Sequence, residues 1–316
     1  MRVVASFGKE DLSTVYLGEL SNGSVIEFVE SVQPPVPRTE KWVLIVSTMC
    51  GCPVNCMMCD AGGDYRGSLS AEEMLEQIDY LVVKRFPDRV VPIPKFKVQF
   101  ARMGEPALNR SVLEVLRVLP TRYKAHGLMP CISTIAPSGA DSFFESLLEI
   151  KENLYSEGRF QLQFSVHTTD EELRNRLIPA KKWSLEKISA YGERFFREGD
   201  RKITLNFAPV RDVFFDGEVV RRLFSPCKFL IKITPINPTY SARANRLVSY
   251  IDSHRIPEDY EDIEVLRDAG YDVLLSIGEL EENRIGSNCG QFVMKYMNEG
   301  RKLKEGYRSY QYRQGP

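Results

Sequence analysis

Short apolar runs that alternate with polar turns open the chain. Three such runs cover residues 3–6, 13–20 and 24–32, and their β-branched and aromatic residues are typical of strands. The dipeptide Asn22-Gly23, between the second and third runs, is a strong signal for a tight hairpin turn. The pattern therefore predicts a small β-hairpin extension at residues 1–38.

Farther along, apolar strands alternate with amphipathic helices. Strands are expected at residues 42–47, 95–101, 131–136, 160–166, 202–208 and 229–236. Helices are expected at residues 70–86, 109–119, 140–152, 170–177, 184–198 and 240–252, with a further short one after residue 208. The first helix begins with a capping box, because Ser70 is followed three residues later by Glu73. Such alternation predicts a parallel sheet with helices outside it.

The number of strand–helix units limits the architecture. Six units are fewer than the eight that close a full barrel. We therefore expect an α/β fold built as a partial (β/α)6 barrel over residues 39–280. A C-terminal segment, residues 281–316, would follow it.

Charge and hydropathy narrow the classes of protein. The 316 residues carry 42 Lys and Arg against 43 Asp and Glu, and this balance gives no support to a protein devoted to a phosphate backbone. Residues 295–316 are locally basic, and Tyr307, Tyr310 and Tyr312 are interleaved among the basic residues, which suits either binding of single-stranded nucleic acid or a frayed, solvated tail. The start lacks the apolar core of a signal peptide, and no apolar run reaches the length of a membrane span. We expect a cytoplasmic monomer with no membrane partner.

Four of the seven cysteines lie within ten residues, from Cys50 to Cys59. An odd number of cysteines, clustered in this way, does not suit a disulfide framework. Cys52, Cys56 and Cys59 have the spacing C-x3-C-x2-C directly after the strand at 42–47. Three thiolates can bind three corners of a cubane iron–sulfur cluster and leave one iron open for catalysis. A zinc site completed by Cys50, or plain buried thiols, are the alternatives.

This spacing, on the loop after the first core strand, resembles that of the radical S-adenosylmethionine (radical SAM) superfamily. Met58 is a mild departure, because an aromatic residue usually precedes the last cysteine there. Five further stretches resemble the RlmN/Cfr family in order and spacing, and members of that family methylate an adenine of ribosomal RNA. They are FARMGEPALN (100–109), CISTIAP (131–137), SVHTTDEELRNRLIP (165–179), INPTYSA (236–242) and NCGQF (288–292).

The resemblance implies two cofactors, a [4Fe-4S] cluster on Cys52, Cys56 and Cys59 and the SAM that chelates its fourth iron. It implies that Gly104 and Glu105 hold the amino group of SAM. The remaining SAM contacts would come from Ser133, Ser165, His167 and Asn237. Without the resemblance, Gly-Glu-Pro would be a turn and His167 a hydrogen-bonded core residue. An electron donor such as flavodoxin or ferredoxin would be a partner.

Cys289 lies in the stretch NCGQF and would be the catalytic residue. In the family this cysteine carries a methyl group as a thioether, and a 5′-deoxyadenosyl radical removes a hydrogen atom from that methyl. The resulting carbon radical adds to an sp2 carbon of the base. An inert buried thiol is the alternative for Cys289.

Three features bear on how far the family mechanism applies. The resolving cysteine, seven positions before the first cluster cysteine, is replaced by Ile45. We expect the protein to lack the family's N-terminal accessory domain, which helps to bind RNA. A general base is expected on the hairpin, and Glu27 and Glu30 both fit the family pattern. They are three residues apart and so face opposite sides of a regular strand.

Two other functions stay open at this point. The first is a divergent radical SAM enzyme that modifies a small molecule, nucleotide or peptide without the two-cysteine mechanism. The second is a non-catalytic iron–sulfur sensor. RNA is expected as a substrate only from the resemblance, because the charge balance does not support it.

Overall fold

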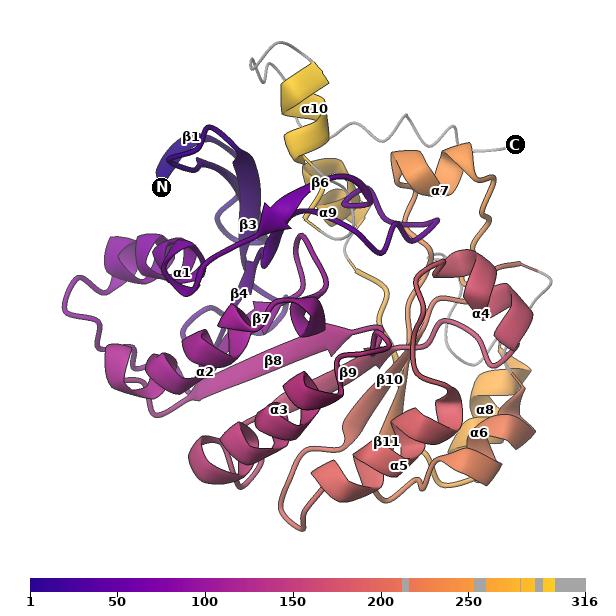
Figure 1. Ribbon diagram of the computed structural model, residues 1–316. Helices are drawn as coiled ribbons and strands as arrows, with labels where there is room; N and C mark the ends of the chain where they lie inside the picture. Colours follow the sequence, from indigo (N-terminus) through magenta and orange to yellow (C-terminus); the bar gives the residue numbers. More distant parts are fainter. Residues whose placement is uncertain (212–215, 253–259, 279, 288–291, 299–316) are drawn as a thin grey trace.

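One long mixed sheet organises the protein in the computed structural model, which describes residues 1–211, 216–252, 260–278, 280–287 and 292–298. Its ten strands follow the order β1-β2-β3-β4-β7-β8-β9-β10-β11-β12 (Figure 1). The N-terminal three are antiparallel, and from β4 to β12 every neighbouring pair is parallel. The strands are β1 (Arg2–Lys9), β2 (Ser13–Glu19), β3 (Val25–Ser31), β4 (Lys41–Val46), β7 (Lys95–Phe100), β8 (Leu128–Thr134), β9 (Gln161–Ser165), β10 (Ile203–Phe207), β11 (Phe229–Ile233) and β12 (Val273–Leu275).

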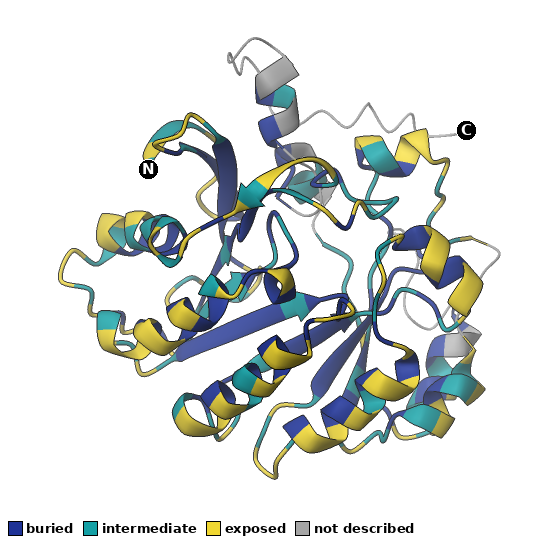
Figure 2. Cartoon of the chain, viewed as in Figure 1, coloured by how far each residue is buried: buried dark blue, intermediate teal, exposed yellow. Residues whose placement is uncertain are grey.

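Helices connect the parallel strands and cover one face of the sheet. Their solvent side is exposed, whereas the strands beneath them are largely buried (Figure 2). The helices are α1 (Ala71–Arg85), the 3-10 turn η1 (Pro106–Leu108), α2 (Ser111–Arg122), α3 (Asp141–Leu154), α4 (Glu171–Leu177), α5 (Leu185–Phe195), α6 (Gly217–Leu223), α7 (Tyr240–Ala244), α8 (Glu261–Asp268), α9 (Leu280–Ile285) and α10 (Phe292–Asn298). The expected α/β class with a parallel sheet is confirmed.

Strand alternation gives the sheet one apolar face and one polar face. In β7, Phe96, Val98 and Phe100 are fully buried in the hydrophobic core. Lys97 and Gln99, which alternate with them, line a cavity on the opposite side. The sheet therefore separates a packed core, on the helix side, from a polar hollow, because successive side chains of a strand point to opposite faces.

Most predicted elements are found; the differences include the helices α8, α9 and α10, which were not predicted. The capping box of α1 is present, since the Ser70 side chain accepts from the Glu73 amide while the Glu73 side chain accepts from the Ser70 amide. The helix expected at 240–252 is only α7, because Asn245 closes it and Arg246 adopts φ 55°. The segment between β4 and α1, residues 47–69, is called the cysteine stretch. Expected as a loop, it contains a two-stranded sheet of β5 (Met49–Cys52) and β6 (Gly63–Ser68). β12 adds a seventh parallel strand.

The C-terminal helices return to the N-terminal strands. Helix α9 contacts β2, and α10 contacts both β2 and β3. Of the helices in the described ranges, none is long and apolar enough to span a membrane. The division into segments 1–38, 39–280 and 281–316 remains a prediction.

Candidate active site

A cavity of about 550 Å³ lies along the polar face of the parallel sheet. Its walls combine the cysteine stretch with residues at or just beyond the carboxyl ends of the parallel strands, where α/β proteins commonly place their sites. The cavity brings together all nine residues predicted to bind the cluster or SAM. These are Cys52, Cys56, Cys59, Gly104, Glu105, Ser133, Ser165, His167 and Asn237.

The three predicted thiol ligands are half-buried. Burial raises the pKa of the Cys52 thiol to about 11, although backbone amides of Val54, Asn55 and Gly104 donate toward its sulfur and oppose that rise. Burial and the neighbouring thiolates also raise the pKa of Cys56 well above its usual range. Ionised thiols this close together need a positive partner, and sulfur-directed amides are typical around iron–sulfur clusters. The donor set therefore fits a cluster.

A single metal ion is a different case. Across the described residues, no three or more His, Cys, Asp or Glu side chains are grouped to hold one ion. A cubane cluster spreads its thiolates over separate irons, so its ligands need not converge on one point.

The cysteine stretch is docked onto α7 and the loop before it. The Thr239 hydroxyl donates to the Met58 carbonyl over 2.8 Å, and the Asn245 amide donates to the Met57 carbonyl over 2.9 Å. Asp60 accepts from the Ser241 backbone N–H over 2.8 Å and also from the Tyr240 N–H. These contacts join segments that are about 180 residues apart, and they place Asn237 and the cysteines in the walls of one cavity.

Gly104 and Glu105 follow β7 and are fixed by their surroundings. Gly104 has φ 99°, and a Cβ there would lie 2.6 Å from the Cβ of Met49, so this position needs glycine. The buried Glu105 carboxylate accepts from the amides of Ala107 and Ile135 at 3.0 and 2.9 Å and from the Thr134 hydroxyl. Burial raises its pKa to about 7 despite these donors. A ligand ammonium would favour the ionised form.

His167 presents a polar atom without a protein partner. Its backbone N–H donates to the Asn206 carbonyl over 3.0 Å, and the residue has φ 68°, a strained conformation outside glycine. The ring atom Nδ1 is buried and has no hydrogen bond. Burial lowers the histidine pKa to about 4, so the ring is neutral at physiological pH. Buried orphan atoms of this kind are commonly completed by a ligand.

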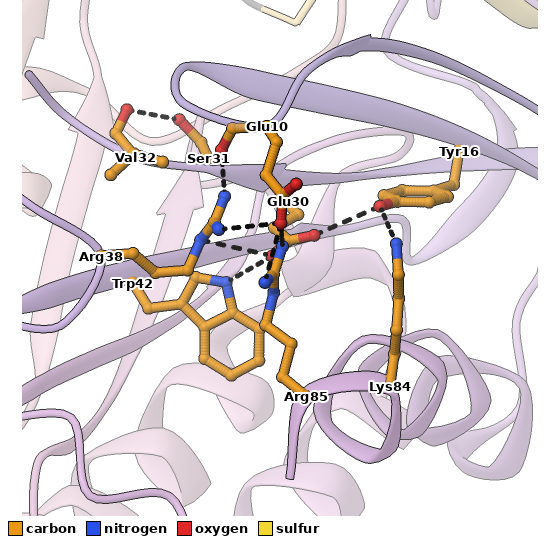
Figure 3. A network of polar contacts seen from close by, with 9 residues as sticks. All are labelled: Glu10, Tyr16, Glu30, Ser31, Val32, Arg38, Trp42, Lys84 and Arg85. Carbon is orange, nitrogen blue, oxygen red and sulfur yellow. Dashed lines mark hydrogen bonds and ion pairs between the residues drawn. The ribbon is translucent and has the colours of Figure 1, made fainter.

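The two candidate bases on β3 point in opposite directions, as alternation predicts. Glu27 forms a 2.5 Å ion pair with Arg102, a residue of the cavity wall, and accepts from the Val293 N–H over 3.0 Å. Glu30 lies on the other face among Arg85, Arg38, Trp42 and Tyr16 (Figure 3). Glu27 is therefore the glutamate on the cavity side, and Arg102 neutralises it there.

Two residues central to the family mechanism have different standing. Cys289 lies outside the described residues, so its role stays a prediction. Arg102 donates to the carbonyls of Gly286 and Ser287, which are the last described residues before Cys289. Ile45 lines the cavity, so an apolar side chain stands where the family has its resolving thiol.

A group of basic residues in the cavity wall was not predicted from the sequence. Lys41, Lys97 and Lys232 come from β4, β7 and β11. A usable signal was present in β7, where the sequence Lys-Phe-Lys-Val-Gln-Phe alternates polar and apolar residues and so predicts a polar face.

No protein-family model matches the chain. It is 26% identical over 292 residues to the probable dual-specificity RNA methyltransferase RlmN of Thermotoga sp. (strain RQ2), covering 88% of this chain and 78% of that protein. It is 30% identical over 251 residues to the ribosomal RNA large subunit methyltransferase N of Nitrosopumilus maritimus (strain SCM1). That match covers 75% of this chain and 66% of that protein. A crystal structure of a radical SAM methyltransferase from Sphaerobacter thermophilus superposes with a TM-score of 0.70 at 20% identity, over 92% of this chain and 80% of that one, and shares its fold.

Fold and relatives together define the class of protein: the chain is a radical SAM enzyme. Within that class it belongs with the RlmN-like methyltransferases, to which it is similar over most of its length.

Proposed function

We propose that the protein cleaves SAM reductively and transfers a methyl group to an sp2 carbon, that of an adenine in RNA or of a related compound. One observation carries the proposal: nine residues from separate segments, each predicted from sequence, line one cavity. The relatives named for RNA methylation support the choice of substrate.

Each part of the cavity has a distinct task in this proposal. Cys52, Cys56 and Cys59 hold the cluster, which supplies the electron for SAM cleavage when it is bound. The backbone at Gly104 allows close approach of the ligand, and the Glu105 carboxylate accepts from the SAM ammonium. Neutral His167 offers Nδ1 to the ligand. Cys289 carries the methyl group, and flavodoxin or ferredoxin supplies the electron.

The direct test is anaerobic reconstitution with iron and sulfide, followed by SAM and a reductant. We expect 5′-deoxyadenosine from the wild type and none from Cys56→Ala, because two thiolates do not hold the cluster in a competent form. Cys50→Ala is the matched control, since Cys50 lies in the same stretch but is packed in the hydrophobic core. It should retain both iron and cleavage. Cleavage by Cys56→Ala at the wild-type rate would refute the ligand assignment.

A second candidate is a divergent radical SAM reaction without the two-cysteine mechanism. Ile45 on the cavity wall favours it, because a methyl–thioether adduct is released in the family by a second thiol. Mass spectrometry of anaerobically purified protein separates the two. An extra methyl on Cys289 supports the methyl-carrier mechanism, and an unmodified thiol supports the divergent reaction.

A further inference from the structure

The cavity extends well beyond the predicted SAM contacts. Lys41 begins β4 and lies five residue steps from Val46 at the carboxyl end of that strand, which is roughly 16 Å of extended chain. Lys97 and Lys232 line the same cavity from β7 and β11. The end marked by these three residues, the lysine end, is distinct from the thiol end formed by the cysteine stretch and Glu105.

The lysine end is crowded with positive charge. Lys41 lies near Lys95, Lys97, Lys232 and Arg201, and burial together with their charges lowers its pKa to about 8. The described carboxylates of the cavity wall are Glu105, at the thiol end, and Glu282 of α9. Like charges gathered on a concave wall create a potential that attracts an anion.

Neutral polar side chains line the cavity between the lysines and the predicted SAM contacts, since Gln99 bonds Ser133 and Asn206 pairs with Ser165. Gln99, Gln163 and Asn206 line the cavity from β7, β9 and β10. Asn206 is 7% exposed, and its Oδ1 atom is buried with no hydrogen-bond partner. Asn206 pairs with Lys232 on the neighbouring strand, and a buried acceptor next to a cation suits a ligand that carries both an anion and a hydroxyl donor. A sugar phosphate has this combination of groups.

We propose that the lysine end binds the phosphate group of a small phosphorylated substrate, such as a nucleotide. The term substrate rests on the proposed function, whereas binding of the anion does not. The position favours a small molecule over RNA, because the lysines lie half-buried inside a cavity of small-ligand size, whereas a nucleic-acid backbone would follow an exposed groove. The phosphate would be held at one end, with the rest of the molecule directed toward the thiol end.

Calorimetry with inorganic phosphate and AMP tests the proposal. We expect the wild type to bind both, and Lys97→Gln and Lys232→Gln each to bind about tenfold more weakly, because each variant removes a charge-assisted contact. The matched control is Lys95→Gln, two residues before Lys97 on the same face of β7 but outside the cavity wall. It should weaken binding by at most about threefold.

A second measurement keeps the test independent of how well the variants fold. Phosphate should raise the Tm of the wild type more than sodium chloride of equal ionic strength does. Unchanged phosphate and AMP affinity in both lysine variants would overturn the proposal. Competition between phosphate and SAM, with an equal loss of SAM affinity in the two lysine variants, would also overturn it. The lysines would then hold the SAM carboxylate.

Two further outcomes separate this inference from the proposed function. Lysine-dependent binding of a short RNA hairpin, without binding of AMP, would overturn the small-molecule assignment. If phosphate binding depends on the lysines but no 5′-deoxyadenosine forms after reconstitution, the anion site stands and the proposed reaction fails. If 5′-deoxyadenosine forms but phosphate binding does not depend on the lysines, the anion site is refuted and the proposed reaction stands.

Discussion

Glu27 and Glu30 lie three residues apart on β3, and both are buried, at 0% and 2% exposure. Glu27 pairs with Arg102, whose side chain is 2% exposed, and so forms a sealed ion pair. The main cations around Glu30 are Arg85 and Arg38, whose side chains are 19% and 22% exposed. The same residue type on one strand therefore meets two electrostatic environments.

The difference teaches how one strand can serve two purposes. On the Glu27 side, the ion pair joins three segments: β3, the loop after β7 and the C-terminal segment around Val293. On the Glu30 side, Trp42 and Tyr16 donate at 3.1 and 3.2 Å, and the cluster fastens α1 to the hairpin (Figure 3). We expect the sealed pair to respond more strongly to loss of one partner, because an unpaired charge there has no access to water.

The largest effect is expected for Arg102→Met. It leaves a buried carboxyl without its cation and removes the hydrogen bonds to Gly286 and Ser287, so the free energy of unfolding should fall by about 3–5 kcal/mol. Urea unfolding measures this change. The double variant Glu27→Gln/Arg102→Met should recover much of the loss, because no charge remains buried. Exposed Arg117→Met, the control, should stay within about 0.5 kcal/mol of the wild type.

A smaller effect is expected for Glu30→Gln. Arg85 and Arg38 keep contact with water and with Glu10, so the free energy of unfolding should fall by about 1–2 kcal/mol. The same urea titration provides the value. A larger loss of unfolding free energy than that of Arg102→Met would contradict the distinction between the fully buried Glu27 pair and the partly exposed ion pairs of Glu30.

The smallest effect is expected at Lys41, which continues the alternation on β4: it faces the cavity, whereas Trp42 faces Glu30. Its pKa is lowered from 10.5 to about 8, so its charge destabilises the fold below pH 8, and this penalty disappears as the pH rises toward 10.5. Lys41→Met should therefore be more stable than the wild type at pH 7, by about 1 kcal/mol after allowance for solvent screening. The gain should vanish near pH 10.

Lys84, on the Glu30 side, is the matched comparison. Its hydrogen bond to Tyr16 raises its pKa, so it stabilises the fold below its ordinary pKa, and that contribution is lost as the pH rises through the raised value. Lys84→Met should therefore be slightly less stable than the wild type at pH 7. If Lys41→Met and Lys84→Met changed the free energy of unfolding in the same direction, the two faces would not provide opposite environments.

Much of this organisation follows from local sequence signals. The capping box at Ser70 located the start of α1, and apolar runs located the strands, because burial of a continuous face requires them. Alternation alone predicted that Glu27 and Glu30 face opposite sides. It did not reveal which of them faces the cavity, because that depends on how β3 pairs with β4 and on Arg102, more than 70 residues away.

Other features required tertiary contacts that no local pattern contains. The helix after Thr239 stops early at Ala244, and the Asn245 side chain then bonds the cysteine stretch instead of continuing the helix. The strand β12 has only three residues, too few for a periodic signal. The lysine end needed three strands to be placed side by side, although alternation within β7 already indicated a polar face.

The docking of the cysteine stretch onto α7 has a thermodynamic consequence. Because Asp60 accepts from the first turn of α7 and Thr239 bonds Met58, we expect the two segments to open and close as one cooperative unit. A group that binds only the folded cysteine stretch must then stabilise α7 by the same free energy, through linkage. Occupancy of the thiols would thereby be communicated, through these hydrogen bonds, to a helix about 180 residues farther along the chain.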